Sequence, residues 1–307
     1  MAVVTTSLRY AARRVSTSRA DPRLAAGMAV AVVLWVLVVA WSDQSLYVSI
    51  PWSGRFVTAE DARSYFGFDY TALYAGRTAW NAIGAYPYSP AFAQLMFPLN
   101  LLPWPLFVAA WTAILIGAVW LLTGPEYFLL GLVVGAMEIA GGNVSLLLAL
   151  AIVKGFRHPW TWSFVLLTKI TPGIGLLWFV VRREWRQLGV ALGATAGIVL
   201  VSYVLMPQAW HDWVDVLRAN VGKSGTWAAV PIPLIVRGPV GAALVVWGAR
   251  RDQRWTVPVG AMLALPALWY GSLSMLLAVI PLTTAEERSW AWERVTAPFR
   301  GSILPTT

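Results

Sequence analysis

The chain has 307 residues, of which 58% are hydrophobic and 12% are charged, about half the charged share of a soluble domain. It contains no cysteine, which excludes disulfides and thiolate metal sites. The net charge of +9 would suggest nucleic-acid binding in a soluble protein, but the basic residues here lie in short connectors, where membrane orientation explains them. We therefore predict a polytopic membrane protein that is surrounded by membrane lipids and has no nucleic-acid partner.

The N-terminal segment carries five arginines ahead of the first apolar run, at 24–41. This run is about as long as a membrane-spanning helix and lacks a small-residue cleavage site, so we expect a retained signal anchor. The positive-inside rule places the arginines in the cytoplasm. We predict a basic cytoplasmic N-terminus at 1–23, a single transmembrane domain at 24–282 and a cytoplasmic tail at 283–307.

The first outer loop, at 43–104, is mixed in composition and contains two candidate short helices, at 59–66 and 91–102. Pro90 and Pro103 bracket the second helix and Pro98 interrupts it, and it is well short of the ~20 residues that a span needs. We expect it to lie along the membrane surface or in a shallow re-entrant position.

The remaining apolar segments alternate in direction between short connectors. We predict helices at 106–122, 127–140, 144–153, 160–168, 172–181, 188–205, 231–249, 257–268 and 272–282. The chain is thus predicted to be an all-α bundle of about ten transmembrane segments, several of them short or broken. Sixteen of the 23 Lys and Arg residues then lie on the cytoplasmic side, as the positive-inside rule requires.

This threading depends on the segment at 160–181. If the segment were one span, every later connector and its arginines would move to the outer side, so the charge asymmetry favours two half-length segments that meet at Lys169. Broken backbone at membrane depth is tolerated only where it is buried in protein or lines a cavity. We therefore expect an internal cavity that opens to the outer face.

Unusual polar and aromatic residues gather on the outer side in this threading, which is the residue-level argument for a functional site. They are Asp69, Arg77, Tyr86, Tyr88, Asn143, Lys169, His211, Asp212, Arg237, Trp269 and Tyr270. Lys169 lies at a helix break just before Pro172, where its ammonium suits a phosphate. The alternative is a lysine that extends to the outer lipid headgroups.

The acidic residues leave alternatives open. Asp69 is either a general base for a hydroxyl nucleophile or an ordinary loop charge or cap, paired with Arg77. Glu138, within an apolar segment, is either a polar contact inside the bundle or part of the site, whereas Asp61 is interpreted as a solvated loop charge. The two histidines lie on opposite faces, so we expect no His-based metal site, and His211 is more simply a structural residue at the membrane interface.

Four stretches follow one another along the chain: FDYTALYAGRTAW, YPYSPAFAQLMFPLNLLPW, GGNVSLLLALAIV and KITPGIGLLWFVVRREWR. Together they resemble the polyprenyl-phosphate-sugar-dependent mannosyltransferases of glycosyltransferase family 87, in the GT-C superfamily, best over 62–186. The resemblance implies an inverting enzyme of the plasma membrane that makes cell-envelope glycolipids. It would move a sugar, usually mannose, from a polyprenyl-phosphate donor to a lipid-linked or cell-envelope glycan acceptor on the outer face, with no other cofactor.

The resemblance also implies roles for individual residues. Asp69 matches the acidic base of the first outer loop, and Lys169 and Arg237 match family cations; with Arg77, these two are our candidates for binding the donor phosphate. Our candidates for binding the rest of the substrates are Tyr86, Tyr88, Asn143, His211, Trp269 and Tyr270.

One late stretch departs from the family pattern. Members commonly carry a sequence like SP…SWDHH, whereas this chain reads LPALWYGSLSMLLAVIPL, with Gly271 and Ser272 where histidines are expected. The missing histidines suggest one alternative to an enzyme, an inactive relative with a binding or scaffolding role. A second alternative is a lipid-sugar flippase or transporter, which would need polar residues along the whole crossing.

Overall fold

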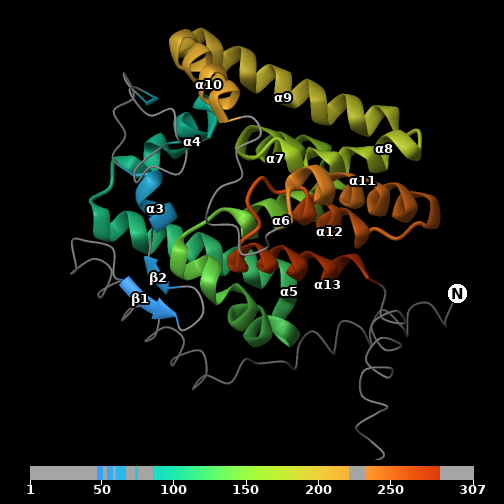
Figure 1. Ribbon diagram of the computed structural model, residues 1–307, viewed down its shortest axis with the longest axis horizontal. Coiled ribbons are helices and arrows are strands. Elements are labelled where there is room, and N and C mark those ends of the chain that lie inside the picture. Colours follow the sequence, from blue (N-terminus) through green and yellow to red (C-terminus); the bar gives the residue numbers. More distant parts are fainter. Residues whose placement is uncertain are drawn as a thin grey trace, which may run out of the picture.

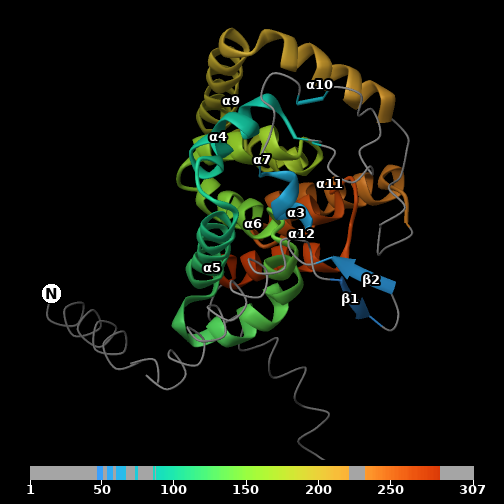
Figure 2. The ribbon, with the colours of Figure 1, turned by 90° about the vertical axis from the view of Figure 1, so that its left-hand side faces the viewer.

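The computed structural model describes residues 47–50, 54–57, 60–66, 73–74, 86, 88–220 and 232–283. The predicted first crossing at 24–41, the base candidate Asp69 and the phosphate candidate Arg77 lie outside the described residues. Figures 1 and 2 show the described chain as a bundle of helices, with α9 and α10 along one edge.

The first loop contributes a two-stranded hairpin and a short helix. β1 (Tyr47–Ile50) pairs antiparallel with β2 (Gly54–Val57), so that Tyr47 lies opposite Val57. The all-α prediction missed this hairpin because four-residue strands are too short to show a clear period of two. The helix α3 (Glu60–Ser64) falls within the predicted helix at 59–66.

The rest of the described chain is helical, as predicted. The elements are α4 (Pro90–Asn100), α5 (Trp104–Gly141), α6 (Ser145–Gly155), η1 (Pro159–Thr161), α7 (Trp162–Thr168), η2 (Thr171–Leu176), α8 (Leu177–Val181), α9 (Trp185–Leu205), α10 (Pro207–Asn220), α11 (Leu234–Arg251), α12 (Thr256–Leu263), η3 (Tyr270–Ala278) and α13 (Val279–Leu282). Among the described helices, α5 and α9 are long and apolar enough to cross a membrane. The number of crossings stays a prediction.

The helix α5 folds back on itself at Gly124. The φ of 64° and ψ of −179° at Gly124 belong to a region that only glycine adopts readily. In a straight helix Gly135 and Val119 would lie about 24 Å apart, yet a Cβ on Gly135 would be 3.5 Å from Cγ2 of Val119. The two limbs of α5 are therefore antiparallel, which agrees with the predicted helices at 106–122 and 127–140.

A second break, at Lys169, separates α7 from η2 and α8. Lys169 follows α7 with an extended φ of −140°, and Thr171 begins η2 with Pro172 in its first turn. The chain then returns antiparallel, because Gly173 packs against Leu166 and Gly175 against Trp162. Two half-length segments that meet at Lys169 are therefore confirmed, in place of one span.

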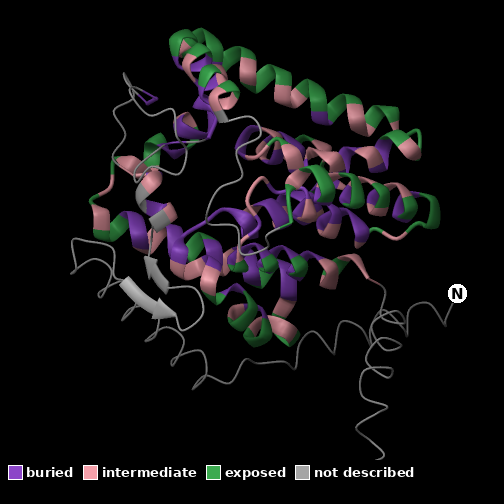
Figure 3. Ribbon diagram, in the orientation of Figure 1, coloured by how far each residue is buried: buried purple, intermediate pink, exposed green. Residues whose placement is uncertain are grey.

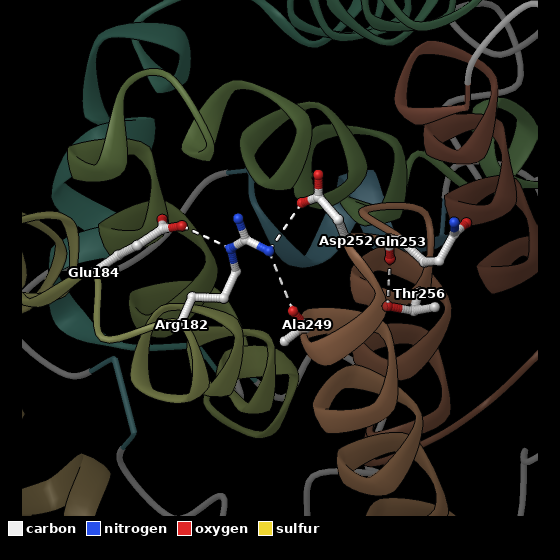
Figure 4. Close-up of polar contacts among 6 residues, drawn as sticks. All are labelled: Arg182, Glu184, Ala249, Asp252, Gln253 and Thr256. Carbon is white, nitrogen blue, oxygen red and sulfur yellow. Dashed lines mark hydrogen bonds and ion pairs between the residues drawn. The ribbon is translucent and has the colours of Figure 1, made fainter.

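The basic connectors meet at the opposite end of the bundle. Figure 4 shows the Arg182 guanidinium, which lies 2.9 Å from Oδ1 of Asp252 and donates to the carbonyl oxygen of Ala249 at 3.2 Å. The guanidinium of Arg254 lies over the ring of Phe156, 5.5 Å from its centroid. The connectors after α6, α8 and α11 thus share one end, as the charge count required.

The outer edge of the bundle is formed by α9, most of whose side chains are exposed, as Figure 3 shows. Its exposed residues are largely apolar, which suits contact with lipid. No helix was predicted between 205 and 231, which was wrong, because this segment contains α10. Its mean hydropathy is low, but Ala209, Trp210, Trp213 and Val216 recur at helical spacing and are buried.

Candidate functional site

Lys169 lies at the end of α7, next to the turn between α5 and α6. Its ammonium Nζ lies 3.5 Å from Oδ1 of Asn143, and its side chain is half-buried. The side chain of Asn143 is itself fixed in position, because the same Oδ1 accepts a hydrogen bond from the backbone N of Val144 at 2.6 Å. An ammonium has three N–H donors, and among the described residues only Asn143 accepts from this one. The other two donors are used by no described residue, which leaves them suited to an anion.

Glu138 accepts hydrogen bonds from the turn between α5 and α6, beside Lys169. Its backbone carbonyl accepts hydrogen bonds from Gly142 and Asn143, and its side-chain Oε1 accepts one from the backbone N of Ser145 at 2.5 Å. The side chain is completely buried. Glu138 is therefore a polar contact inside the bundle, at the turn that carries Asn143, the partner of Lys169.

The first outer loop reaches this turn through α3. A Cβ on Gly142, whose φ is 73°, would lie 2.6 Å from Cβ of Ala62, so α3 sits directly on the turn. Asp61, in the same helix, is half-buried. Its interpretation as a solvated loop charge was wrong, because it lies in α3, which packs on Gly142.

The predicted substrate ligands Tyr86 and Tyr88 lie in an aromatic cluster behind the site. They are 4% and 6% exposed. The hydroxyl of Tyr88 lies 3.0 Å from that of Tyr65, and the backbone carbonyl of Tyr88 accepts from the hydroxyl of Tyr74 at 2.5 Å. Burial raises the pKa of the Tyr65 and Tyr88 hydroxyls well above the ordinary value. Both therefore stay neutral and bind each other as neutral groups.

The late hairpin lies against Glu138 from the other side. A Cβ on Gly271 would lie 2.5 Å from Oε2 of Glu138 and would also collide with the ring of Trp269. Trp269 caps η3, with its backbone N 3.4 Å from Oγ of Ser272, and Tyr270 is 43% exposed. A histidine at position 271 would therefore need the space that the Glu138 carboxylate occupies. Spacing along the chain cannot reveal this contact.

Two other candidates have partners of their own. The guanidinium of Arg237 is buried and donates to the backbone carbonyls of Ile232 at 2.7 Å, Leu263 at 2.7 Å, Leu265 at 3.1 Å and Pro266 at 3.4 Å. Backbone carbonyls of the described residues thus use four of its five N–H groups. His211 is exposed on α10, with Nε2 3.2 Å from the hydroxyl of Tyr203. Within the described chain, no hydrogen bond or ion pair joins either residue to Lys169.

The comparisons with known proteins give one match. The model of glycosyltransferase family 87 matches residues 86–299, more than half of the chain. The matched region contains Glu138, Asn143, Lys169 and the late hairpin, whereas Asp69 and Arg77 precede it. No curated protein and no solved structure matches this chain.

Proposed function

This chain belongs to glycosyltransferase family 87, and we propose that it moves a sugar from a polyprenyl-phosphate donor to a lipid-linked or cell-envelope glycan acceptor. Membership of the family makes it a membrane glycosyltransferase. The proposal adds the donor class, mannose as the transferred sugar and the outer face of the plasma membrane as the place of reaction.

The observation that carries the proposal is the environment of Lys169. A cation at a helix break, with two N–H donors that no described residue uses, is suited to a phosphate oxygen. The break lies at the opposite end of the α7–α8 hairpin from Arg182 and the other basic connectors. If those connectors face the cytoplasm, the phosphate site faces outward.

The helix α4 offers a path for the lipid tail. Oγ of Ser89, at the start of α4, donates to the backbone carbonyl of Leu167 at 2.5 Å, which places this end of α4 near Lys169. Leu95, Phe97 and Leu101 are exposed along the helix. An apolar surface that leads to a phosphate site suits a polyprenyl chain, and this supports the surface or re-entrant position predicted for α4.

In the proposed reaction the acceptor hydroxyl attacks the anomeric carbon of the sugar. Asp69 accepts the hydroxyl proton as the new C–O bond forms. The bond between the anomeric carbon and the phosphate oxygen breaks on the opposite face, so the configuration inverts and polyprenyl phosphate leaves with the electron pair. Lys169 lowers the barrier by neutralising charge that develops on this leaving phosphate.

The direct test is transfer of labelled mannose from polyprenyl-phosphate-mannose to membrane acceptors by the purified full-length protein. We expect Asp69→Asn to lower kcat about a hundredfold, because general-base catalysis is lost. Asp215→Asn is the matched control, since Asp215 is exposed on α10, and it should transfer at the wild-type rate. Wild-type rates from Asp69→Asn would remove Asp69 as the base.

The same assay separates the alternatives. The inactive alternative is favoured by Gly271, which stands where the family carries a histidine. It predicts no transfer by the wild type from any polyprenyl-linked sugar. A flippase or transporter would instead move the labelled lipid between leaflets without any acceptor.

The orientation of the site can be tested by cysteine labelling, because the chain has no cysteine. Tyr270 is exposed beside the late hairpin, and His158 is exposed at the basic end. On intact cells an impermeant maleimide should label Tyr270→Cys, whereas His158→Cys should react only after permeabilisation. The opposite pattern would place the Lys169 site in the cytoplasm.

A further inference from the structure

Three connectors bring their basic residues together at the end of the bundle opposite Lys169. Nη1 of Arg182, just after α8, lies 2.9 Å from Oδ1 of Asp252, just after α11, and Figure 4 shows this contact. The guanidinium of Arg254 lies over the ring of Phe156, just after α6, at 5.5 Å from its centroid. The connectors after α6, α8 and α11 therefore share one surface.

Both carboxylates of this surface are used by one arginine. Oε1 of Glu184 lies 2.9 Å from Nε of Arg182, and Oδ1 of Asp252 lies 2.9 Å from Nη1 of the same guanidinium. The three connectors, at 154–158, 182–186 and 250–254, contain no other acidic residue. Every other arginine in these connectors is therefore left without a carboxylate from them.

Five exposed arginines of this surface form no ion pair and no side-chain hydrogen bond with any described residue, and we call them the arginine patch. They are Arg157, Arg183, Arg186, Arg250 and Arg251. Unpaired like charges on one surface repel one another and attract anions. A guanidinium is especially suited to a phosphate, because its planar fork donates two parallel hydrogen bonds to the phosphate oxygens.

Exposed tryptophans lie next to the arginine patch in the sequence. Trp160 follows Arg157 by three residues, Trp185 directly precedes Arg186, and Trp247 lies near the end of α11. The three side chains are 59%, 60% and 48% exposed. Tryptophan gathers at the level of the lipid headgroups, where its ring meets the apolar layer and its N–H meets water. We therefore expect the arginine patch at the headgroup level, where the neighbouring anions are lipid phosphates.

We propose that the arginine patch binds the headgroups of anionic phospholipids, so that these lipids gather around this end of the bundle. The partner is a lipid with a net negative charge, because a zwitterionic headgroup also carries a cation that the arginines repel. The patch and Lys169 lie at opposite ends of the α7–α8 hairpin, so these lipids are separate from the proposed sugar donor. The proposal does not depend on sugar transfer.

The test compares spin-labelled phosphatidylglycerol with spin-labelled phosphatidylcholine of the same acyl chains, each in trace amounts, in phosphatidylcholine vesicles that hold the full-length protein. At low salt the wild type should prefer phosphatidylglycerol about fivefold, the effect of roughly one arginine close to a headgroup. At about 1 M NaCl the preference should disappear, because salt screens exposed charges. Equal affinity of the wild type for the two lipids at low salt overturns the proposal without any variant.

Variants then locate the preference. Replacing Arg183, Arg250 and Arg251 together by Gln should reduce it to about twofold or less at low salt. The control is Arg218→Gln, which should keep the wild-type preference. Arg218 is exposed and paired with Asp215 on α10, and the 21 residues of α9, which span about 30 Å, separate it from the patch.

Two further results would contradict the proposal. An unchanged preference in the triple variant would show that anionic lipids are held elsewhere on the protein. Loss of the wild-type preference on addition of inorganic phosphate, at constant ionic strength, would indicate a site for a free anion in place of a lipid surface. Neither result bears on the phosphate role proposed for Lys169, which the transfer assay tests.

Discussion

Replacing Lys169 by Gln should lower kcat/KM for sugar transfer roughly a thousandfold, the upper range for loss of a group that stabilises charge in a transition state. Lys169 is half-buried at the break between α7 and η2, and its N–H donors are largely uncommitted among the described residues. No other described cation is bonded to this turn, so the charge that develops on the leaving phosphate would have no replacement partner. Initial rates at varied donor concentration give the measurement.

Two further variants make this result interpretable. Lys154→Gln removes a lysine that is exposed in the last turn of α6 at the basic end, and it should keep the wild-type kcat/KM. Lys169→Arg should recover activity only partly, because the planar guanidinium does not fit the position of a compact ammonium. If Lys169→Gln transfers sugar at the wild-type rate, the phosphate binds elsewhere in the protein.

The largest expected effect on stability is at the crossing of α11 and α12. A Cβ on Gly260 would lie 2.7 Å from the carbonyl oxygen of Gly241 and 2.6 Å from Cγ2 of Val245. Backbone cannot give way as a flexible side chain can, so Gly260→Ala should destabilise the fold by about 2–3 kcal/mol, as overpacked cores do. Thermal unfolding in detergent should show a clearly lower Tm.

The effect of Gly260→Ala should extend to the site. The last residue of α12, Leu263, and Leu265 just after it supply carbonyls that bind Arg237, and this segment leads into the hairpin of Trp269 and Gly271. The matched control is Gly117→Ala in α5, where a Cβ meets nothing within 4 Å, and its Tm should equal or exceed that of the wild type. Equal Tm values for the two variants would contradict the close crossing.

Much of the helical plan follows from local chemistry that can be read along the chain. The break at Gly124 follows from a Gly-Pro pair, and the break at Lys169 from a charge and a proline between two short apolar segments. Both were predicted, because φ/ψ preferences and the cost of a charge at membrane depth belong to the residue itself. Counting basic residues also placed the connectors after α6, α8 and α11 on one side, and the structure brings these three together at one end of the bundle.

The partners of the site residues were predicted less well. Arg237 was expected at a phosphate, yet the structure surrounds it with four backbone carbonyls. Asp61 was interpreted as a solvated charge, yet it is half-buried in α3, which packs on Gly142. No helix was predicted for α10 because its mean hydropathy is low, although Ala209, Trp210, Trp213 and Val216 follow a helical spacing that the sequence already shows.

By itself the sequence determined the membrane class, the family and the two breaks, because composition, charge and backbone preference are properties of each residue and its neighbours. Only the tertiary structure decided that the Glu138 carboxylate binds the start of α6 and that Gly271 leaves room for it. Those facts depend on contacts between α5, α6 and η3, which lie up to 133 residues apart in the chain for Glu138 and Gly271. Such contacts are set by how whole elements pack, which no local pattern encodes.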